Sequence, residues 1–281
     1  MKRNLHPYFP LFVLPTLAAF VISFLIPFVM GIYLSFCKFT TVANAQWTGL
    51  ENYRRIFSDS SFTNALWFTV KFTIVSVITV NVFAFLLALV LTRGLRGTNV
   101  FRTIFFMPNL IGGIVLGYIW NLIINGVLSF FGTDITYKAA YGFWGLVILT
   151  NWQLIGYMMV IYIAGLQNIP GDITEAAEID GASKGQITLR ITIPMVMPSV
   201  TICTFLTLTN SFKLFDQNLA LTAGAPGRET AMLALDIYNT FYGRPGWQGA
   251  GQAKAVIFFI IAAAIAFIQL RLTEGKGAEG R

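Results

Sequence analysis

The sequence predicts an all-α polytopic membrane protein with six transmembrane helices. Of its 281 residues, 56% are hydrophobic and only 11% are charged, and the mean hydropathy is +0.70. A soluble domain carries about 25% charged residues, so this composition excludes an ordinary globular protein. The apolar residues also gather into stretches near the roughly 20 residues that a helix needs to cross a bilayer.

The predicted spans follow one another with polar loops between them. The first is too long for the apolar core of a cleaved signal peptide, so we interpret it as a retained helix kinked by Pro15 and Pro27. Gly113 and Gly117 form a G-x-x-x-G pattern in the third span, which permits close helix packing. The six spans are Leu11–Phe36, Phe68–Leu91, Ile104–Ile124, Phe143–Leu166, Val196–Leu214 and Ala253–Leu270.

The basic residues orient these spans. A net charge of +7 would suggest nucleic acid in a soluble protein, but here the cations are dispersed over loops, which favours retention on the cytoplasmic side and contact with anionic lipid. The short loop Thr92–Arg102 decides the orientation, because it holds three arginines. With both termini in the cytoplasm, the inside segments carry ten Lys or Arg against six outside; the ten are Lys2, Arg3, Arg93, Arg96, Arg102, Lys184, Arg190, Arg271, Lys276 and Arg281.

The stretch Ile169–Pro198 is the long polar interruption whose charges are organised. Its first half has a helical period, with Pro170 suited to the first turn and Gly181 to the left-handed end of the helix. Ser183 and Gln186 form a capping box that predicts a second short helix, which Pro194 should stop. Two short helices joined at a glycine, with alanines on one face, predict a knob that docks into another protein.

Several catalytic motifs are excluded. Gly181–Gly185 spells G-x-S-x-G, but that motif needs a preceding strand and a histidine partner, and His6 in the N-terminal tail is the one histidine. The sequence has no G-x-x-x-x-G-K-[ST] phosphate loop. Cys37 and Cys203 are predicted to be buried free thiols, and with one histidine they offer no tetrahedral metal site. We therefore predict no catalytic residue, no metal and no cofactor in this chain.

Polar groups inside spans are the candidates for a substrate path, because they face the bundle interior or a wet path by default. Asn210, Lys213 and Asp216 recur at a spacing of three and should share one face near the outer end of the fifth span. A structural Lys213–Asp216 pair is the alternative. Phe215 could supply an aromatic ring beside them. The candidate path residues are Asn151, Gln153, Asn210, Phe212, Lys213 and Asp216.

The knob carries a resemblance to a known family. The run E-A-A-x-x-D-G-A at Glu175–Ala182, followed by I-x-I-P ending at Pro194, resembles the EAA loop of ABC-importer permeases. Three further segments, Gly49–Arg54, Leu95–Pro108 and Ser211–Asp216, resemble the carbohydrate branch, above all the first permease subunit of maltose-, lactose- and glycerol-phosphate-type importers. Two positions differ: Gly185 and Thr188 stand where that branch usually has Trp and Phe.

The resemblance implies a type I importer permease, with an N-terminal helix and outer loop (1–61) and a five-helix core (62–281) that contains the EAA loop (169–198). It implies one half of a permease heterodimer in the cytoplasmic membrane that imports a sugar or sugar derivative. The implied partners are a second permease subunit, two ABC ATPase subunits that bind ATP and Mg, an extracytoplasmic sugar-binding protein and membrane lipid, with no nucleic acid. The implied ATPase-coupling residues are Glu175, Ala176, Ala177, Asp180, Gly181, Ala182, Ser183 and Pro194.

Three alternatives stay open at this stage. An ABC permease for a different small solute would have the same knob. A secondary transporter would need no knob and would show internal repeats, which are not visible here. An intramembrane hydrolase would need a catalytic pair within the spans, which the sequence lacks.

Overall fold

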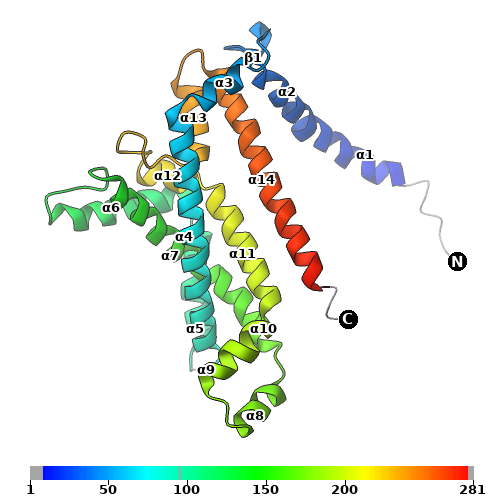
Figure 1. The fold of residues 1–281 in the computed structure, drawn as a ribbon, viewed down its shortest axis with the longest axis vertical. Helices are drawn as coiled ribbons and strands as arrows, with labels where there is room; N and C mark the ends of the chain where they lie inside the picture. The colour runs from blue at the N-terminus through cyan, green and yellow to red at the C-terminus, as the bar shows by residue number, and fades with distance from the viewer. Residues whose placement is uncertain (1–8, 95, 278–281) are drawn as a thin grey trace. The chain divides into compact units, whose positions relative to one another are not determined.

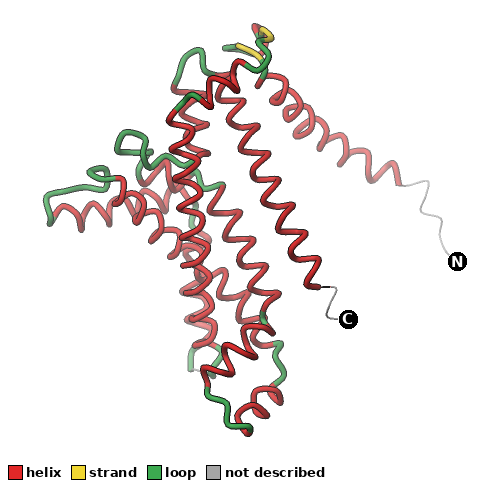
Figure 2. The backbone as a smooth tube through the Cα atoms, in the orientation of Figure 1, coloured by secondary structure: helices red, strands yellow, loops and turns green. Residues whose placement is uncertain are grey.

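The computed structural model describes residues 9–94 and 96–277, which form two compact units (Figures 1 and 2). The first unit combines the chain up to residue 62 with residues 237–260, and the second combines residues 63–236 with the chain from 261 onward. His6, Leu95 and Arg281, on which parts of the sequence interpretation rest, lie outside the described residues.

The first unit starts with a long apolar helix and a short hairpin. Helix α1 (Phe9–Phe20), the π-helical turn η2 (Val21–Leu25) and α2 (Ile26–Ser35) follow without a break, and β1 (Cys37–Lys38) pairs antiparallel with β2 (Gln46–Trp47) around the turn η3 (Val42–Asn44). Helix α3 (Glu51–Phe57) comes next. The unit also contains the start of α4 (Ser60–Leu91) and the parts of α13 (Leu233–Gly243) and α14 (Gln248–Gly277) within 237–260.

Asn52 anchors the polar segment that follows the hairpin. Its side-chain Nδ2 donates hydrogen bonds of 2.9 Å to the carbonyl oxygens of both Ser35 and Cys37, so one amide holds α3 against the end of α2. Gly49 begins this turn at a φ of +62°, which favours glycine. The loop predicted over Lys38–Ser61 is therefore an ordered cap with a strand pair and a helix.

The second unit is a helical bundle with two bent helix pairs. Its elements after α4 are α5 (Thr98–Phe106), η4 (Met107–Leu110), α6 (Gly113–Ser129), α7 (Ala139–Gln167), α8 (Gly171–Ile179), α9 (Lys184–Ile187), the π-helical turn η5 (Thr188–Thr192), α10 (Ile193–Met195), α11 (Met197–Phe212), α12 (Asp216–Leu221) and the start of α13. Helices α8 and α9 lie together at one end of this unit (Figure 1).

Most of the predicted spans are confirmed, and one is wrong as a single helix. Within the described residues, four helices are long and apolar enough to cross a membrane, namely Val13–Ser35, Ser60–Leu91, Ala139–Gln167 and Gln248–Gln269, and the number rises to six if each bent pair counts as one span. The third predicted span, Ile104–Ile124, instead breaks at extended residues Ile111 and Gly112, where the two helical pieces meet at 102°. The turn η4, which contains Pro108, ends at Leu110, so the chain leaves the helix there and a new helix starts at Gly113.

The predicted fifth span corresponds to α11, and the helical segment before it, Lys184–Met195, meets it at a bend of 71°. Pro194 was predicted to stop the preceding helix, but the helix continues to Met195 because the π-helical turn η5 comes before the proline. A π-helical turn likewise precedes Pro27 in the first unit. In both places the wider turn accommodates a proline that cannot donate to the carbonyl four residues earlier.

Helices α4, α7 and α11 pack around a shared core. The small side chains of Ala84 and Ala88 on α4 are fully buried, and they belong to the same cluster as Met158 on α7 and Cys203 on α11. Cys203 and Cys37 are free thiols, as predicted. Small residues let helix backbones approach closely, which is how helices associate where lipid removes the hydrophobic drive.

Three glycines mark close approaches between helices in this unit. A Cβ on Gly113 or Gly117 would lie 2.7 Å from the Cβ of Asp216 or Ala220, so the G-x-x-x-G face packs directly on α12. A Cβ on Gly156 would meet the backbone carbonyl of Phe105 at 1.8 Å, so α7 touches the α5 backbone there. These contacts fix α5, α6 and α12 against α7.

In the first unit, Asp59 joins two cations. Its Oδ2 accepts 2.9 Å and 3.0 Å hydrogen bonds from Arg244 and from Lys254, and the Lys254 side chain is fully buried. Lys254 also donates to Thr240 at 2.9 Å. Burial raises the pKa of Asp59, but the hydrogen bonds from Lys254 and Ser61 outweigh it and hold that pKa at about 2.

We expect Asp59→Asn to destabilise the protein strongly, because Arg244 and the buried Lys254 would lose the carboxylate that they share. Removing one member of a buried ion pair costs roughly 3–5 kcal/mol. Since the pKa of Asp59 lies below its unfolded value, the wild type should hold this stabilisation above about pH 4 and lose it as the pH falls toward 2. Thermal unfolding of the detergent-solubilised chain measures both effects, and Glu51→Gln, an exposed carboxylate of the same unit, is the control. Equal unfolding temperatures for the two variants would contradict this role.

We also expect Gly156→Ala to disrupt the packing of α5 on α7, because backbone atoms cannot give way as a flexible side chain can. Overpacking of this kind typically costs about 1–3 kcal/mol. Gly126→Ala, at a helical position with open space around it, should be neutral or slightly stabilising. Size-exclusion profiles and melting temperatures of the two proteins separate the cases. A Gly156→Ala protein as stable as Gly126→Ala would refute the close contact.

Candidate functional site

The structure contains two candidate sites, and both lie in the second unit. One is the loop formed by α8, α9 and their connection, residues 169–198, which we call the coupling loop. The other is a polar cavity among α7, α11, α12 and η4.

The two helices of the coupling loop are defined by their caps. Helix α8 ends at Ile179, and Gly181 follows with a φ of +80°, while the N–H of Ala182 donates to the carbonyl of Ala177 at 3.0 Å. This is the Schellman arrangement that a glycine permits. At the start of α9 the predicted capping box is present: Ser183 N donates to Gln186 Oε1 at 2.8 Å, and Gln186 N donates to Ser183 Oγ at 3.3 Å. Pro170 caps α8 just before its first residue.

The outer surface of the coupling loop exposes two large apolar side chains among its polar residues. Ile179 is 87% exposed and Leu189 is 67% exposed, although both are large hydrophobic residues. Sequence reasoning emphasised the alanines and missed these two side chains. Among the residues assigned to coupling, those exposed are Glu175, Ala176, Asp180, Gly181, Ser183 and Pro194, and those half-buried are Ala177 and Ala182.

The positions that depart from the family pattern also lie here. A Cβ on Gly185 would meet no atom within 4 Å, so nothing in the fold demands a glycine there. Thr188 faces inward, where it lines a second cavity of about 600 Å3 between the loop and the ends of α4 and α7.

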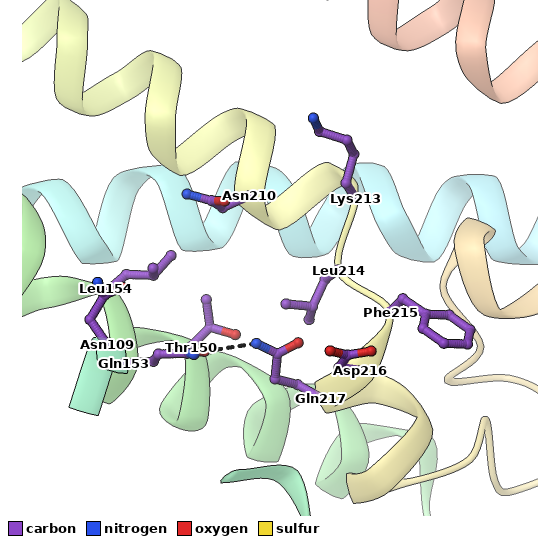
Figure 3. Close-up of a pocket in the computed structure, with 10 residues that line it drawn as sticks. All are labelled: Asn109, Thr150, Gln153, Leu154, Asn210, Lys213, Leu214, Phe215, Asp216 and Gln217. Atoms are coloured by element: carbon purple, nitrogen blue, oxygen red, sulfur yellow. Dashed lines mark hydrogen bonds between the residues drawn. The ribbon is translucent and has the colours of Figure 1, made fainter. Parts of the chain in front are cut away.

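The polar cavity has a volume of about 370 Å3 and an amide-rich wall (Figure 3). Gln217 Nε2 donates a 2.8 Å hydrogen bond to Gln153 Oε1, and Gln153 Nε2 donates at 3.4 Å to the carbonyl of Ile111 at the bend after η4. The amides thus tie α12, α7 and the broken span together. The lining residues are Asn109, Thr150, Gln153, Leu154, Asn210, Lys213, Leu214, Phe215, Asp216 and Gln217.

Four of the six predicted path residues meet in this cavity, but not in the way predicted. Helix α11 ends at Phe212, so Lys213 forms its C-cap and Asp216 belongs to α12 rather than to the same helix face. The turn at Leu214 nevertheless brings Asn210, Lys213 and Asp216 around one space (Figure 3).

Lys213 and Asp216 do not form the structural pair that the sequence left open. No ion pair joins these two side chains in the part of the chain that the structure describes, and Figure 3 shows the Lys213 amine directed away from Asp216. Both side chains are exposed. The cavity therefore carries one positive and one negative charge that are separately available.

The other two predicted residues lie elsewhere. Asn151 is buried against α4, where its Nδ2 donates to Thr79 Oγ1 at 2.9 Å and to the carbonyl of Val147 at 2.8 Å. Phe212 is buried, whereas Phe215 lines the cavity. Asn109 and Gln217 were missed, because one follows a proline at an unforeseen bend and the other starts a helix that the sequence did not indicate.

Comparison with known proteins gives concordant matches. A family model described as "Binding-protein-dependent transport system inner membrane component" matches residues 81–274. The "Probable starch degradation products transport system permease protein AmyD" of Thermoanaerobacterium thermosulfurigenes is 45% identical over 96% of this chain and 94% of its own length. The "Multiple sugar-binding transport system permease protein MsmF" of Streptococcus mutans is 28% identical over 90% of this chain and 91% of its own.

A solved structure has the same fold. A chain from a bacterial ABC transporter involved in the import of the acidic polysaccharide alginate superposes with a TM-score of 0.79 at 19% sequence identity, covering 97% of both chains. At that identity the likeness concerns the fold alone.

Proposed function

The chain belongs to the family of binding-protein-dependent transport system inner membrane components, and from this membership we propose that it is a permease subunit of an ABC importer for a sugar or sugar derivative. The observation that carries the proposal is the 45% identity, over nearly the whole chain, to a permease named for starch degradation products. Starch fragments are neutral and rich in hydroxyl groups, so a cavity that carries them should offer hydrogen-bonding groups and no net charge.

The cavity suits a neutral, hydroxyl-rich cargo. Four amide side chains supply both donors and acceptors, and Phe215 supplies an aromatic face. The single Lys and the single Asp balance, so the lining favours neither a cationic nor an anionic cargo. We propose that this cavity is this subunit's share of the translocation path.

The coupling loop suits docking to an ATPase subunit. We propose that a protein partner covers the exposed large apolar side chains of Ile179 and Leu189, which would remove their apolar surface from water. Glu175 and Asp180 beside them offer carboxylates to basic residues of a cleft. We propose that ATP and Mg are bound and hydrolysed by two such partner subunits, and that this chain transmits their motion without catalysing a reaction.

The remaining assembly follows from the family. We propose that a second permease subunit completes the path and that an extracytoplasmic binding protein delivers the cargo. The chain would be multi-pass in the cytoplasmic membrane with the coupling loop and both termini inside, an orientation supported by Arg93, Arg96 and Arg102 in one short loop.

We expect Asn210→Leu to weaken uptake by removing a hydrogen-bonding amide from the cavity while keeping a similar volume. Losing one such hydrogen bond costs roughly 0.5–1.5 kcal/mol, which corresponds to about a threefold to tenfold higher half-saturation concentration for sugar uptake. Thr209→Val, one residue away and outside the cavity, should leave that concentration unchanged. If both variants match the wild type, Asn210 does not contact the cargo.

We expect Gly181→Val to break coupling while the chain stays inserted. Valine at a φ of +80° costs on the order of 1–3 kcal/mol, so the loop would re-aim α9 instead of holding this conformation. The ATPase should then fail to co-purify, or its hydrolysis should no longer drive uptake. Gly185→Val is the control, because that glycine has a helical conformation and open space.

Glu175→Lys should have the same outcome by a different route, since it places repulsion where attraction is needed. Normal co-purification and uptake in both Gly181→Val and Glu175→Lys would remove the coupling role from this loop.

A further inference from the structure

The cavity under the coupling loop has no part in the cargo path or in the outer docking surface. It measures about 600 Å3, within the roughly 300–1,000 Å3 typical of small-molecule sites. One wall comes from the ends of α4 and α7, with Thr92 and Arg93 contributing polar groups. The opposite wall comes from the loop itself, with Thr174, Glu178, Lys184 and Thr188 among its residues.

The two cations of this cavity are uncommitted. Among the described residues, neither Arg93 nor Lys184 forms an ion pair or a side-chain hydrogen bond. Glu178 is exposed and forms no ion pair with them either. The lining thus holds two positive charges against one negative charge, on walls that belong to different parts of the fold.

The threonine hydroxyls determine what else a ligand must carry. Thr92 Oγ1 donates to the carbonyl of Ala88 at 2.9 Å, and Thr174 and Thr188 likewise donate to backbone carbonyls of Gly171 and Lys184. Each hydroxyl has one proton, so these three oxygens remain available only as acceptors. A ligand that fits must bring hydroxyl donors to them as well as negative charge to the cations.

We propose that this cavity binds the phosphate ester of a polyol, with the phosphate between Arg93 and Lys184 and the polyol hydroxyls donating to the threonines, while the carboxylate of Glu178 opposes the phosphate charge. A tetrahedral phosphate can contact cations on both walls at once through charge-assisted hydrogen bonds. A neutral sugar lacks the charge, and inorganic phosphate lacks the polyol hydroxyls.

Binding would tie the coupling loop to the bundle. Arg93 follows the end of α4, whereas Lys184 begins α9, so a ligand held by both restrains the loop that the proposed function requires to move. In the proposed orientation the site faces the cytoplasm. Two ligands there would be phosphate esters of a polyol: a soluble sugar phosphate, and the glycerol phosphate headgroup of phosphatidylglycerol in the inner leaflet. The restraint on the coupling loop rests on the proposed function, whereas the binding itself does not.

The test measures binding to the full chain in nanodiscs, without partners or transport. In one arm, glucose 6-phosphate is titrated into chain held in phosphatidylcholine, with glucose and inorganic phosphate as comparison ligands. In the other arm, mass spectrometry quantifies the phosphatidylglycerol retained from mixed vesicles relative to phosphatidylcholine. Binding in the first arm identifies a soluble ligand, and selective retention in the second identifies a lipid.

The variants decide whether the bound ligand occupies this cavity. Arg93→Gln with Lys184→Gln should weaken binding about tenfold or more, since each charge-assisted contact is worth at least that. Arg96→Gln with Arg190→Gln removes two exposed cations of the same loops outside the cavity and should change little. Glu178→Gln should tighten binding, a gain that misfolding cannot produce.

Any of three results overturns the proposal. The first is that neither probe binds the wild-type chain. The second is that the two double variants bind alike, and the third is that Glu178→Gln binds no better than the wild type.

Discussion

Polar groups inside a membrane must find their partners within the protein, and this constraint holds the bundle together. Asn81, at the middle of α4, accepts a 2.8 Å hydrogen bond from the Tyr162 hydroxyl on α7 and donates at 3.3 Å to Thr207 on α11. Asn151 on α7 adds a second link to α4 through Thr79. Interhelical hydrogen bonds in lipid are each worth about 0.6–2 kcal/mol, but each also fixes the register of two helices. The cavity and the coupling loop are both built on this three-helix frame.

Helix breaks and close contacts at proline and glycine residues arrange the remaining helices around these three. The break after Pro108 turns the third span aside, and Gly113 and Gly117 let α12 pack on the redirected α6. Because α12 starts directly after the turn at Leu214, its first residues face Gln153 across the cavity. The bend at Val196 similarly separates the coupling loop from α11. The same local breaks therefore create both the polar cavity and the loop that projects from the bundle.

The sequence predicts the parts of this structure that depend on local signals. Hydropathy locates the spans, and the cap chemistry of Gly181 and Ser183 predicts the two loop helices to within a residue or two. The misses have a tertiary origin. A long apolar run conceals the bend at Gly112, and only contact with α4 shows that Asn151 is a structural amide while Gln153, two residues on, lines the cavity. The spacing of Asn210, Lys213 and Asp216 predicted that these residues share one helix face. They do lie around one space, but a turn between two helices brings them there.

The central claim is that the coupling loop lies in the cytoplasm and is covered by an ATPase subunit. The most direct measurement is labelling of Ala176→Cys with a membrane-impermeant maleimide, on a background in which the buried Cys37 and Cys203 are replaced by alanine. Asp134→Cys, in the exposed connection between α6 and α7, reports the opposite side. The account predicts that in intact cells only Cys at 134 reacts, and that in inside-out vesicles Cys at 176 reacts freely until the ATPase is bound. Labelling at 176 in intact cells, or equal labelling with and without the ATPase, would contradict it.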